Sequence, residues 1–386
     1  MFQMSLDVPL RVMWGACRNP AGSSAAEAFA TCGIKTFLFE QSSPSIAKPC
    51  GDAIPLCMLD EFQIPIHLMD HLVTRMKILC PSNLADDFGK TIKPHEFIAM
   101  LRRKVLDSFL HSRAKSHDAV VISDLVTNLD MSTTPNSPYV IDYVVDKTSR
   151  HKLAVDVVID EDVANSRVAK SIGGENYTCA IAFQQRIKLP NEKIEYYKNL
   201  AEMYIGNNVS PDFYGWVFPK CDPVAVGTST VREKQDIKLY QCGIRESVKA
   251  KINGGKVIKV EAHPIPEHPR PRRVRGRVAL VGDAAGYVTK CSGKGIYFAA
   301  KSRRICGEGI VKGSEGEERM INKGDLRREY LKKWDKEFIL TNRFLDLLVI
   351  CIRSWHVGID GKMLGKTIGS LVRCNIIGEK MNLLNL

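Results

Sequence analysis

A carboxylate and several glycines lie within one short stretch of the sequence. Residues 278–281 form an apolar, β-branched run that predicts a buried strand, and the pentapeptide 282–286, Gly-Asp-Ala-Ala-Gly, ends it at a turn. A glycine-rich loop follows, and we expect a helix to begin near Gly295. This order places the Asp283 carboxylate and bare backbone N–H groups at the carboxyl end of a strand, where open α/β sheets bind ligands. The carboxylate can accept sugar hydroxyls, whereas a lone Gly-Asp would fit any strand-to-helix turn.

Three segments together resemble the plant and cyanobacterial geranylgeranyl reductases. They are residues 278–303, the segment 214–220 (Tyr-Gly-Trp-Val-Phe-Pro-Lys) and the segment 261–273. The resemblance extends from about residue 11 to about residue 336, and residues 367–373 return to it. It implies an FAD-containing, NADPH-dependent enzyme of chlorophyll and tocopherol synthesis in the chloroplast, in the stroma or on the thylakoid surface.

The resemblance also implies the fold class, which is α/β. It is the glutathione-reductase-like FAD-binding fold of the p-hydroxybenzoate hydroxylase type, with an antiparallel β substrate domain and a helical C-terminal tail. At 386 residues the chain is long enough for two interleaved domains. The expected boundaries are 10–45, 95–167 and 270–312 for the FAD-binding domain, 46–94 and 168–269 for the substrate domain, and 313–386 for the helical region.

Composition restricts the classes of partner. The net charge of +12 would suit nucleic acid, an anionic membrane surface or a small polyanion. The densest basic cluster, residues 270–277, is broken by prolines and has no interleaved aromatic residues, so we expect no nucleic-acid partner. It predicts a solvated basic loop, with a phosphate-facing role as the alternative.

Cysteine spacing and hydropathy bear on compartment and membrane. The 12 cysteines show no zinc-type spacing and follow no secretory signal, so we expect reduced thiols and no metal. The longest apolar run, 344–352, is too short to span a bilayer and predicts a buried or membrane-surface helix, so peripheral membrane association stays open. Residues 1–10 contain Asp7 and no arginine, unlike a transit peptide.

The first part of the chain has the pattern of a βαβ unit. Residues 11–14 and 34–40 read as strands and residues 21–31 as a helix, which puts Glu40 where an acid binds the ribose of an adenine dinucleotide. The related family has Gly-x-Gly-Pro-Ala-Gly in the first turn. Anchoring that pattern on Gly22 leaves Cys17 and Asn19 at its first two glycines.

Two further segments contribute candidates through the resemblance. Residues 49–52 resemble the family's Pro-Cys-Gly-Gly segment beside the flavin ring, with Asp52 at its second glycine. A thiol there can deliver or position a proton, although Cys50 taken alone is a small buried hydrophobe. Arg103 opens an amphipathic helix that runs to about His117, in the pattern that places arginine against FAD. Taken alone, an arginine on a helix is a solvated charge.

A predicted strand at 154–159 leads into residues 160–167, where the family has Gly-Ala-Asp-Gly-Ala-Asn-Ser-Arg. Asp162 is retained, whereas the added carboxylates of Asp160 and Glu161 are expected to repel a diphosphate, and Val163 poorly adopts a positive φ. Arg167 is placed near that diphosphate by position alone. Lys294, in the glycine-rich loop, replaces a family glutamate.

The resemblance implies a reductase that uses FAD and NADPH to convert geranylgeranyl, as the diphosphate or bound to chlorophyll, into phytyl. The site residues it implies are Cys50, Tyr214 and Trp216 facing the isoprenoid substrate, and Gly22, Glu40, Arg103, Asp162, Asp283, Gly286, Gly293 and Gly295 on the cofactor. The alternative is a non-catalytic paralogue with impaired FAD binding that acts as a prenyl-binding or assembly partner. It rests on the departures at Cys17, Asn19, Asp52, Asp160, Val163 and Lys294.

Overall fold

The structure is a computed structural model. It describes residues 11–15, 29, 33–39, 49–79, 85–87, 89, 93–134, 136–146, 148–161, 166–174, 177–289, 293–314 and 321–338. Several predictions lie outside these residues. They are those for Cys17, Asn19, Gly22, Glu40, Asp162, Val163, most of the helix at 21–31, and the segments 344–352 and 367–373.

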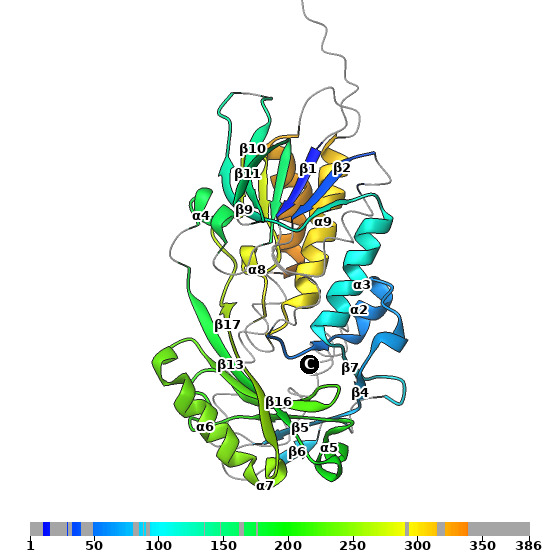
Figure 1. Ribbon diagram of the computed structural model, residues 1–386, viewed down its shortest axis with the longest axis vertical. Coiled ribbons are helices and arrows are strands. Elements are labelled where there is room, and N and C mark those ends of the chain that lie inside the picture. The colour runs from blue at the N-terminus through cyan, green and yellow to red at the C-terminus, as the bar shows by residue number, and fades with distance from the viewer. Residues whose placement is uncertain are drawn as a thin grey trace, which may run out of the picture.

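A six-stranded, mostly parallel sheet forms one half of the molecule (Figure 1). Its order is β18 (Val274–Arg275), β19 (Val278–Leu280), β12 (Val157–Asp160), β1 (Arg11–Gly15), β2 (Lys35–Phe39) and β8 (Val120–Ile122). Strands β12 and β19 are completely buried, as expected where both faces of a parallel sheet are covered. The long helix α9 (Ile296–Ser314) contributes Cys306 and Ile310 to the same core. The strand predicted at 278–281 is observed at 278–280, and the helix predicted to begin near Gly295 begins at Ile296, so both predictions are confirmed.

The strand predicted at 154–159 is two strands. β11 (Ser149–Val155) belongs to a small antiparallel sheet with β10 (Tyr139–Val145) and β9 (Leu125–Asp130), whereas β12 belongs to the parallel sheet. Asp156 separates them: its carboxylate accepts the Arg11 N–H at 2.8 Å, and its own N–H donates to the Arg11 carbonyl at 2.7 Å. These bonds to the start of β1 turn the chain from one sheet into the other.

A seven-stranded sheet forms the other half, at the bottom of Figure 1. Its order is β17 (Lys256–Pro266), β13 (Cys179–Lys188), β16 (Pro223–Thr230), β15 (Gly215–Pro219), β14 (Leu200–Tyr204), β5 (Arg75–Leu79) and β6 (Ala85–Asp87). All neighbours are antiparallel except β14 and β5. Helix α6 (Ile237–Ser247) packs its buried residues Tyr240 and Ile244 against this sheet. This sheet corresponds to the antiparallel β domain that the resemblance implies.

Short elements connect these halves. Strands β3 (Ala53–Ile54), β7 (Ile98–Met100) and β4 (His71–Val73) form a small sheet beside helix α3 (Arg103–Ser116), which confirms the helix predicted from Arg103. The remaining elements are α2 (Leu56–Glu61), η1 (Ile66–Leu68), α4 (Arg167–Ser171), α5 (Asn191–Tyr197), η3 (Lys234–Asp236), α7 (Lys249–Ile252), α8 (Gly282–Ala285), α10 (Lys323–Asp325) and η4 (Leu326–Leu331). Within the described residues, no helix combines the length and the hydropathy needed to cross a bilayer.

The basic cluster at 270–277 is only in part the solvated loop that we expected: Arg272 and Arg275 are exposed, whereas the other three arginines are held inside the protein. Arg270 is 3% exposed and donates from Nε to the Ala284 carbonyl at 2.8 Å. Arg273 donates to the Asp335 carboxylate, and the buried Arg277 guanidinium stacks 4.3 Å from the Tyr139 ring. These three arginines link segments inside the protein. They can lose their hydration because a carbonyl, a carboxylate and an aromatic face interact with their guanidinium groups instead.

One carboxylate is buried deep in the seven-stranded sheet. Glu202 in β14 is 0% exposed and accepts hydrogen bonds from the hydroxyls of Tyr196, Tyr197 and Tyr204 at 3.0, 3.1 and 2.8 Å. Lys251 Nζ lies 2.7 Å from it and supplies the opposite charge. The cluster satisfies the carboxylate fully, so we assign it to stability and not to chemistry.

Candidate functional site

The Asp283 segment forms a short helix at the end of β19. Helix α8 begins at Gly282, with φ +52°, and is capped after Ala285 by Gly286, with φ +80°. A Cβ atom at Gly286 would collide with the Tyr177 hydroxyl and the His268 carbonyl, so backbone conformation and space both require glycine. Gly286 thus ends α8, and it is not among the residues that line the cavity described next.

One cavity brings together every other predicted site residue that the structure describes. It has a volume of about 160 Å³, which is comparable to an engineered cavity that admits benzene. The predicted residues on its wall are Cys50, Arg103, Tyr214, Trp216, Asp283, Gly293 and Gly295. They come from four separate parts of the chain, and the seven-stranded sheet contributes further residues to the wall.

Aromatic side chains form one wall of the cavity. Phe213 and Tyr214 stack with ring centroids 4.4 Å apart, and Trp216 and Phe218 in β15 stack at 6.3 Å. On the neighbouring strand, a Cβ at Gly227 would lie 2.6 Å from the Trp216 ring, so glycine leaves the space that the indole occupies. This wall is suited to a long apolar chain.

A buried cation stands on another wall. Arg103 at the start of α3 is 7% exposed, and its Nε donates to Asp107 at 3.1 Å. Burial alone would lower the pKa of this guanidinium, but the Asp107 carboxylate one turn later raises it above its usual range. Arg103 therefore stays charged beside the cavity.

The Cys50 thiol lies between charges of both signs. Burial and the Asp52 carboxylate raise the pKa of Cys50, and they outweigh the opposite effects of Arg103 and Lys220. The thiol is consequently protonated at neutral pH, which suits it to hold a proton and not to act as a nucleophile.

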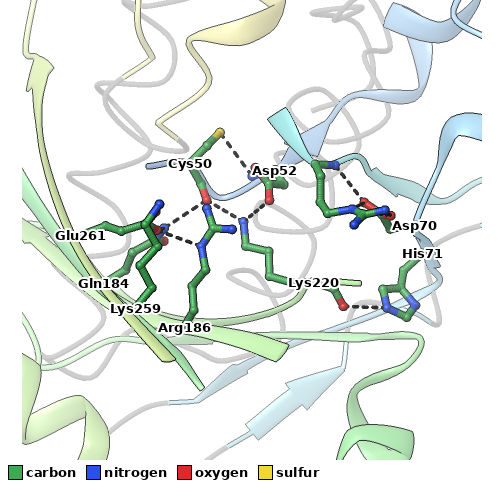
Figure 2. A network of polar contacts seen from close by, with 10 residues as sticks. Cys50, Asp52, Asp70, His71, Gln184, Arg186, Lys220, Lys259 and Glu261 are labelled. Carbon is green, nitrogen blue, oxygen red and sulfur yellow. Dashed lines mark hydrogen bonds and ion pairs between the residues drawn. The ribbon is translucent and has the colours of Figure 1, made fainter. Parts of the chain in front are cut away.

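Sequence reasoning treated Asp52 only as a departure from a family pattern and Lys220 only as the last residue of a motif. In the structure their side chains form an ion pair at 2.5 Å, with 3% and 1% exposure (Figure 2). Asp52 has φ +63°, a conformation that glycine favours, which agrees with the glycine expected there. No signal within either segment could have revealed the pair.

Glu261 is a buried carboxylate on the cavity wall, and it was also missed. It accepts from Gln184 at 2.8 Å and from Arg186 at 2.9 Å, and Lys259 Nζ lies 2.7 Å away (Figure 2). Burial alone would raise the pKa of Glu261, but the hydrogen bonds from Lys259 and Gln184 and the charge of Arg186 bring it below its usual value. The carboxylate is therefore ionised and neutralised within the protein.

We expect Glu261→Gln to change the acid stability of the protein in a defined way. Since the pKa is lowered in the folded state, the ionised carboxylate stabilises the fold above the usual glutamate pKa, and this stabilisation is lost as pH falls through the lowered value. The stability difference between parent and E261Q should thus be largest at neutral pH and shrink in acid. Urea unfolding at several pH values measures it. Glu246→Gln, which changes an exposed ion pair, should run parallel to the parent.

The added carboxylates at 160 and 161 have partners inside the protein. Ser166 Oγ donates to Asp160, and Glu161 forms an ion pair with the fully buried Arg303 of α9. The repulsion that we expected from two bare charges is therefore reduced by pairing. Lys294 donates its backbone N–H to Thr289 Oγ1 at 3.1 Å and does not line the cavity, and Arg167 is exposed at the start of α4.

The cavity meets the chemical requirements of a flavin. Asp283 provides an acceptor for hydroxyls, Arg103 provides a fixed positive charge, and Gly293 and Gly295 leave an open wall for a planar ring. A Cβ at Gly295 would lie 3.2 Å from Asp283 Oδ1 and 3.5 Å from Val288, so a side chain there would narrow the space. Within the described residues, no cluster of side chains suits a metal ion.

Comparison with known proteins agrees with this arrangement, although no family model matches the chain. A Nicotiana tabacum protein named chloroplastic geranylgeranyl diphosphate reductase is 58% identical over 336 residues, covering 86% of this chain and 72% of the relative. A geranylgeranyl bacteriochlorophyll reductase-like structure from Thermoplasma acidophilum has a TM-score of 0.75 at 18% identity, over 96% of this chain and 93% of that one. A myxobacterial FAD-dependent halogenase has a TM-score of 0.67 at 15% identity, over 87% and 81%. The predicted fold class is confirmed.

Proposed function

Because the chain belongs to the geranylgeranyl diphosphate reductase family, we propose that it is a flavin-dependent reductase that saturates double bonds of a geranylgeranyl chain. The observation that carries the proposal is the convergence of Cys50, Arg103, Asp283 and the aromatic wall on one cavity. The fold, which this chain has in common with an FAD-dependent halogenase, supports FAD as the cofactor. Nothing in the comparisons supports the non-catalytic alternative.

The cofactor would be held by groups from the parallel-sheet half of the protein. Asp283 and Arg103 would bind its polar parts, and Gly293 and Gly295 would lie under its ring. Glu40, Gly22 and Asp162 would bind the adenosine diphosphate part, by the sequence pattern alone. Gly286 would contribute indirectly, by ending α8 so that Asp283 faces the cavity.

When bound, FAD supplies hydride chemistry, with NADPH as the proposed source of electrons. The protein's own contribution is to orient an unactivated alkene and to exclude water from it. Tyr214 and Trp216 would hold the isoprenoid against the glycine wall, since their rings face the cavity. The protonated Cys50 thiol would hold, at Sγ, a proton that the reduction of an alkene requires in addition to hydride.

The compartment and the form of the substrate are part of the same proposal. We infer a chloroplast location from the chloroplastic relative, in the stroma or on the thylakoid surface. The substrate would be geranylgeranyl as the diphosphate or bound to chlorophyll, which leads to chlorophyll and tocopherol synthesis. Peripheral membrane association would suit so apolar a substrate.

The visible absorption spectrum of the purified protein tests the proposal. After FAD is added and the excess removed, we expect the two flavin bands to remain with the protein and to bleach on anaerobic addition of NADPH. Product analysis with geranylgeranyl diphosphate would follow. A colourless protein that FAD cannot reconstitute would contradict the reductase and favour the non-catalytic alternative. If the protein retains flavin that NADPH does not bleach, the result would contradict NADPH as the source of electrons and leave the rest of the proposal standing.

A further inference from the structure

The backbone carbonyl of Cys50 is held by two side chains of the seven-stranded sheet. Lys220 Nζ donates to this oxygen at 2.6 Å, and Gln184 Nε2 donates to it at 3.3 Å (Figure 2). Lys220 directly follows β15, and Gln184 lies in β13. The two bonds attach the segment that carries the thiol to the sheet that carries the aromatic wall.

Asp52 holds Lys220 in turn. Its Oδ2 lies 2.5 Å from Lys220 Nζ, and both side chains are almost completely buried. Asp52 Oδ1 has no hydrogen-bond partner among the described residues, so the carboxylate depends on Lys220 for compensation. Asp52 is unfavourable here for two reasons. Its charge is buried, and its φ of +63° is a backbone conformation that favours glycine.

We propose that Asp52 and Lys220 are positioning residues for the Cys50 thiol. Lys220 fixes the Cys50 carbonyl, and Asp52 fixes Lys220, so that Sγ stays at the cavity wall near Arg103. The inference rests on the proposed function, in which Cys50 faces the substrate. Beyond that function, the inference adds the Asp52–Lys220 ion pair. Asp52 occupies a position at which the related family has glycine.

The same pair should set how readily the thiol ionises. The charged groups that act on Cys50 are Asp52, Arg103 and Lys220. Burial has the largest effect on the Cys50 pKa and raises it, Asp52 raises it further, and Arg103 and Lys220 lower it. Removing Asp52 or Lys220 therefore has opposite effects on thiol ionisation, which a merely structural role would not produce.

The test is the pH dependence of Cys50 alkylation by iodoacetamide in the flavin-free full-length chain, followed by mass spectrometry of the Cys50 peptide. We expect Asp52→Gly to move the midpoint of the rate profile down and Lys220→Met to move it up by less, since Asp52 has the larger effect on the Cys50 pKa. Lys152→Met, which removes an exposed lysine of β11, is the matched control and should leave the midpoint unchanged.

The double variant Asp52→Gly/Lys220→Met keeps the test decisive if Lys220→Met does not fold. It removes both charges together, so its midpoint should return close to that of the parent. Its plateau rate at high pH should rise several-fold, since the Cys50 carbonyl has lost its main donor. Midpoints that do not move in the single variants, or a plateau equal to that of the parent in the double variant, would overturn the proposal. No flavin, substrate or turnover enters this measurement, so a failed reductase assay leaves its outcome intact.

Discussion

A Glu202→Leu variant is expected to lose about 4 kcal/mol of folding free energy. The hydroxyls of Tyr197 and Tyr204, which are 0% and 6% exposed, would lose their acceptor, and each buried unsatisfied group costs about 1–3 kcal/mol. Lys251 would also lose its counter-charge. Guanidinium unfolding followed by circular dichroism measures the change.

Tyr196→Phe is the matched control for that variant. Tyr196 also donates to Glu202, at 3.0 Å, but its side chain is 43% exposed and water can replace the bond. It should cost no more than about 1 kcal/mol. Equal, small losses in both variants would show that the buried carboxylate does not hold this sheet together.

An Asp283→Ala variant is expected to bind FAD about 100-fold more weakly. A hydrogen bond to a charged group contributes about 1.5–3 kcal/mol, and each 1.4 kcal/mol is a factor of ten in affinity. Asp283 supplies this acceptor at the start of α8, on the cavity wall. Titration of the apoprotein with FAD, followed by quenching of flavin fluorescence, gives the dissociation constant.

Two companions make that result specific. Glu308→Ala removes an acid of the following helix α9 whose side chain is 61% exposed, and it should leave FAD affinity unchanged. Asp283→Asn keeps an acceptor without the charge and should fall between parent and alanine. If D283A binds FAD as tightly as the parent, the cavity is not the flavin site and Asp283 has another role.

The order of strand, short turn, glycine loop and helix could be predicted because it is written in consecutive residues. An apolar β-branched run at 278–281 and glycines at its end indicate that local structure whatever surrounds it. The resemblance then indicated which distant segments meet there, and Cys50, Arg103 and Tyr214 do line one cavity with Asp283. The part of the site at Gly22, Glu40 and Asp162 stays a prediction.

What the sequence could not indicate depends on partners far along the chain. Residues 154–159 are rich in β-branched side chains and read as one strand, whereas in the fold Asp156 pairs with Arg11 where the chain passes from one sheet to the other. Arg273 and Arg277 look solvated in the sequence, but in the fold they pack against Asp335 and Tyr139. Asp52 likewise looks like a defect in a glycine motif until Lys220 is seen to neutralise it. Side-chain burial and ion pairing are properties of the assembled fold.

The strand order of the parallel sheet has a consequence for synthesis on the ribosome. β12, at residues 157–160, pairs on one side with β1 and on the other with β19, which is made more than a hundred residues later. The strands β13 to β17 lie between β12 and β19 in the sequence. They form the seven-stranded sheet together with β5 and β6, which are synthesised before β12. A nascent chain that pauses before residue 278 therefore exposes the open hydrogen-bonding edge of a buried strand, the kind of surface that chaperones protect.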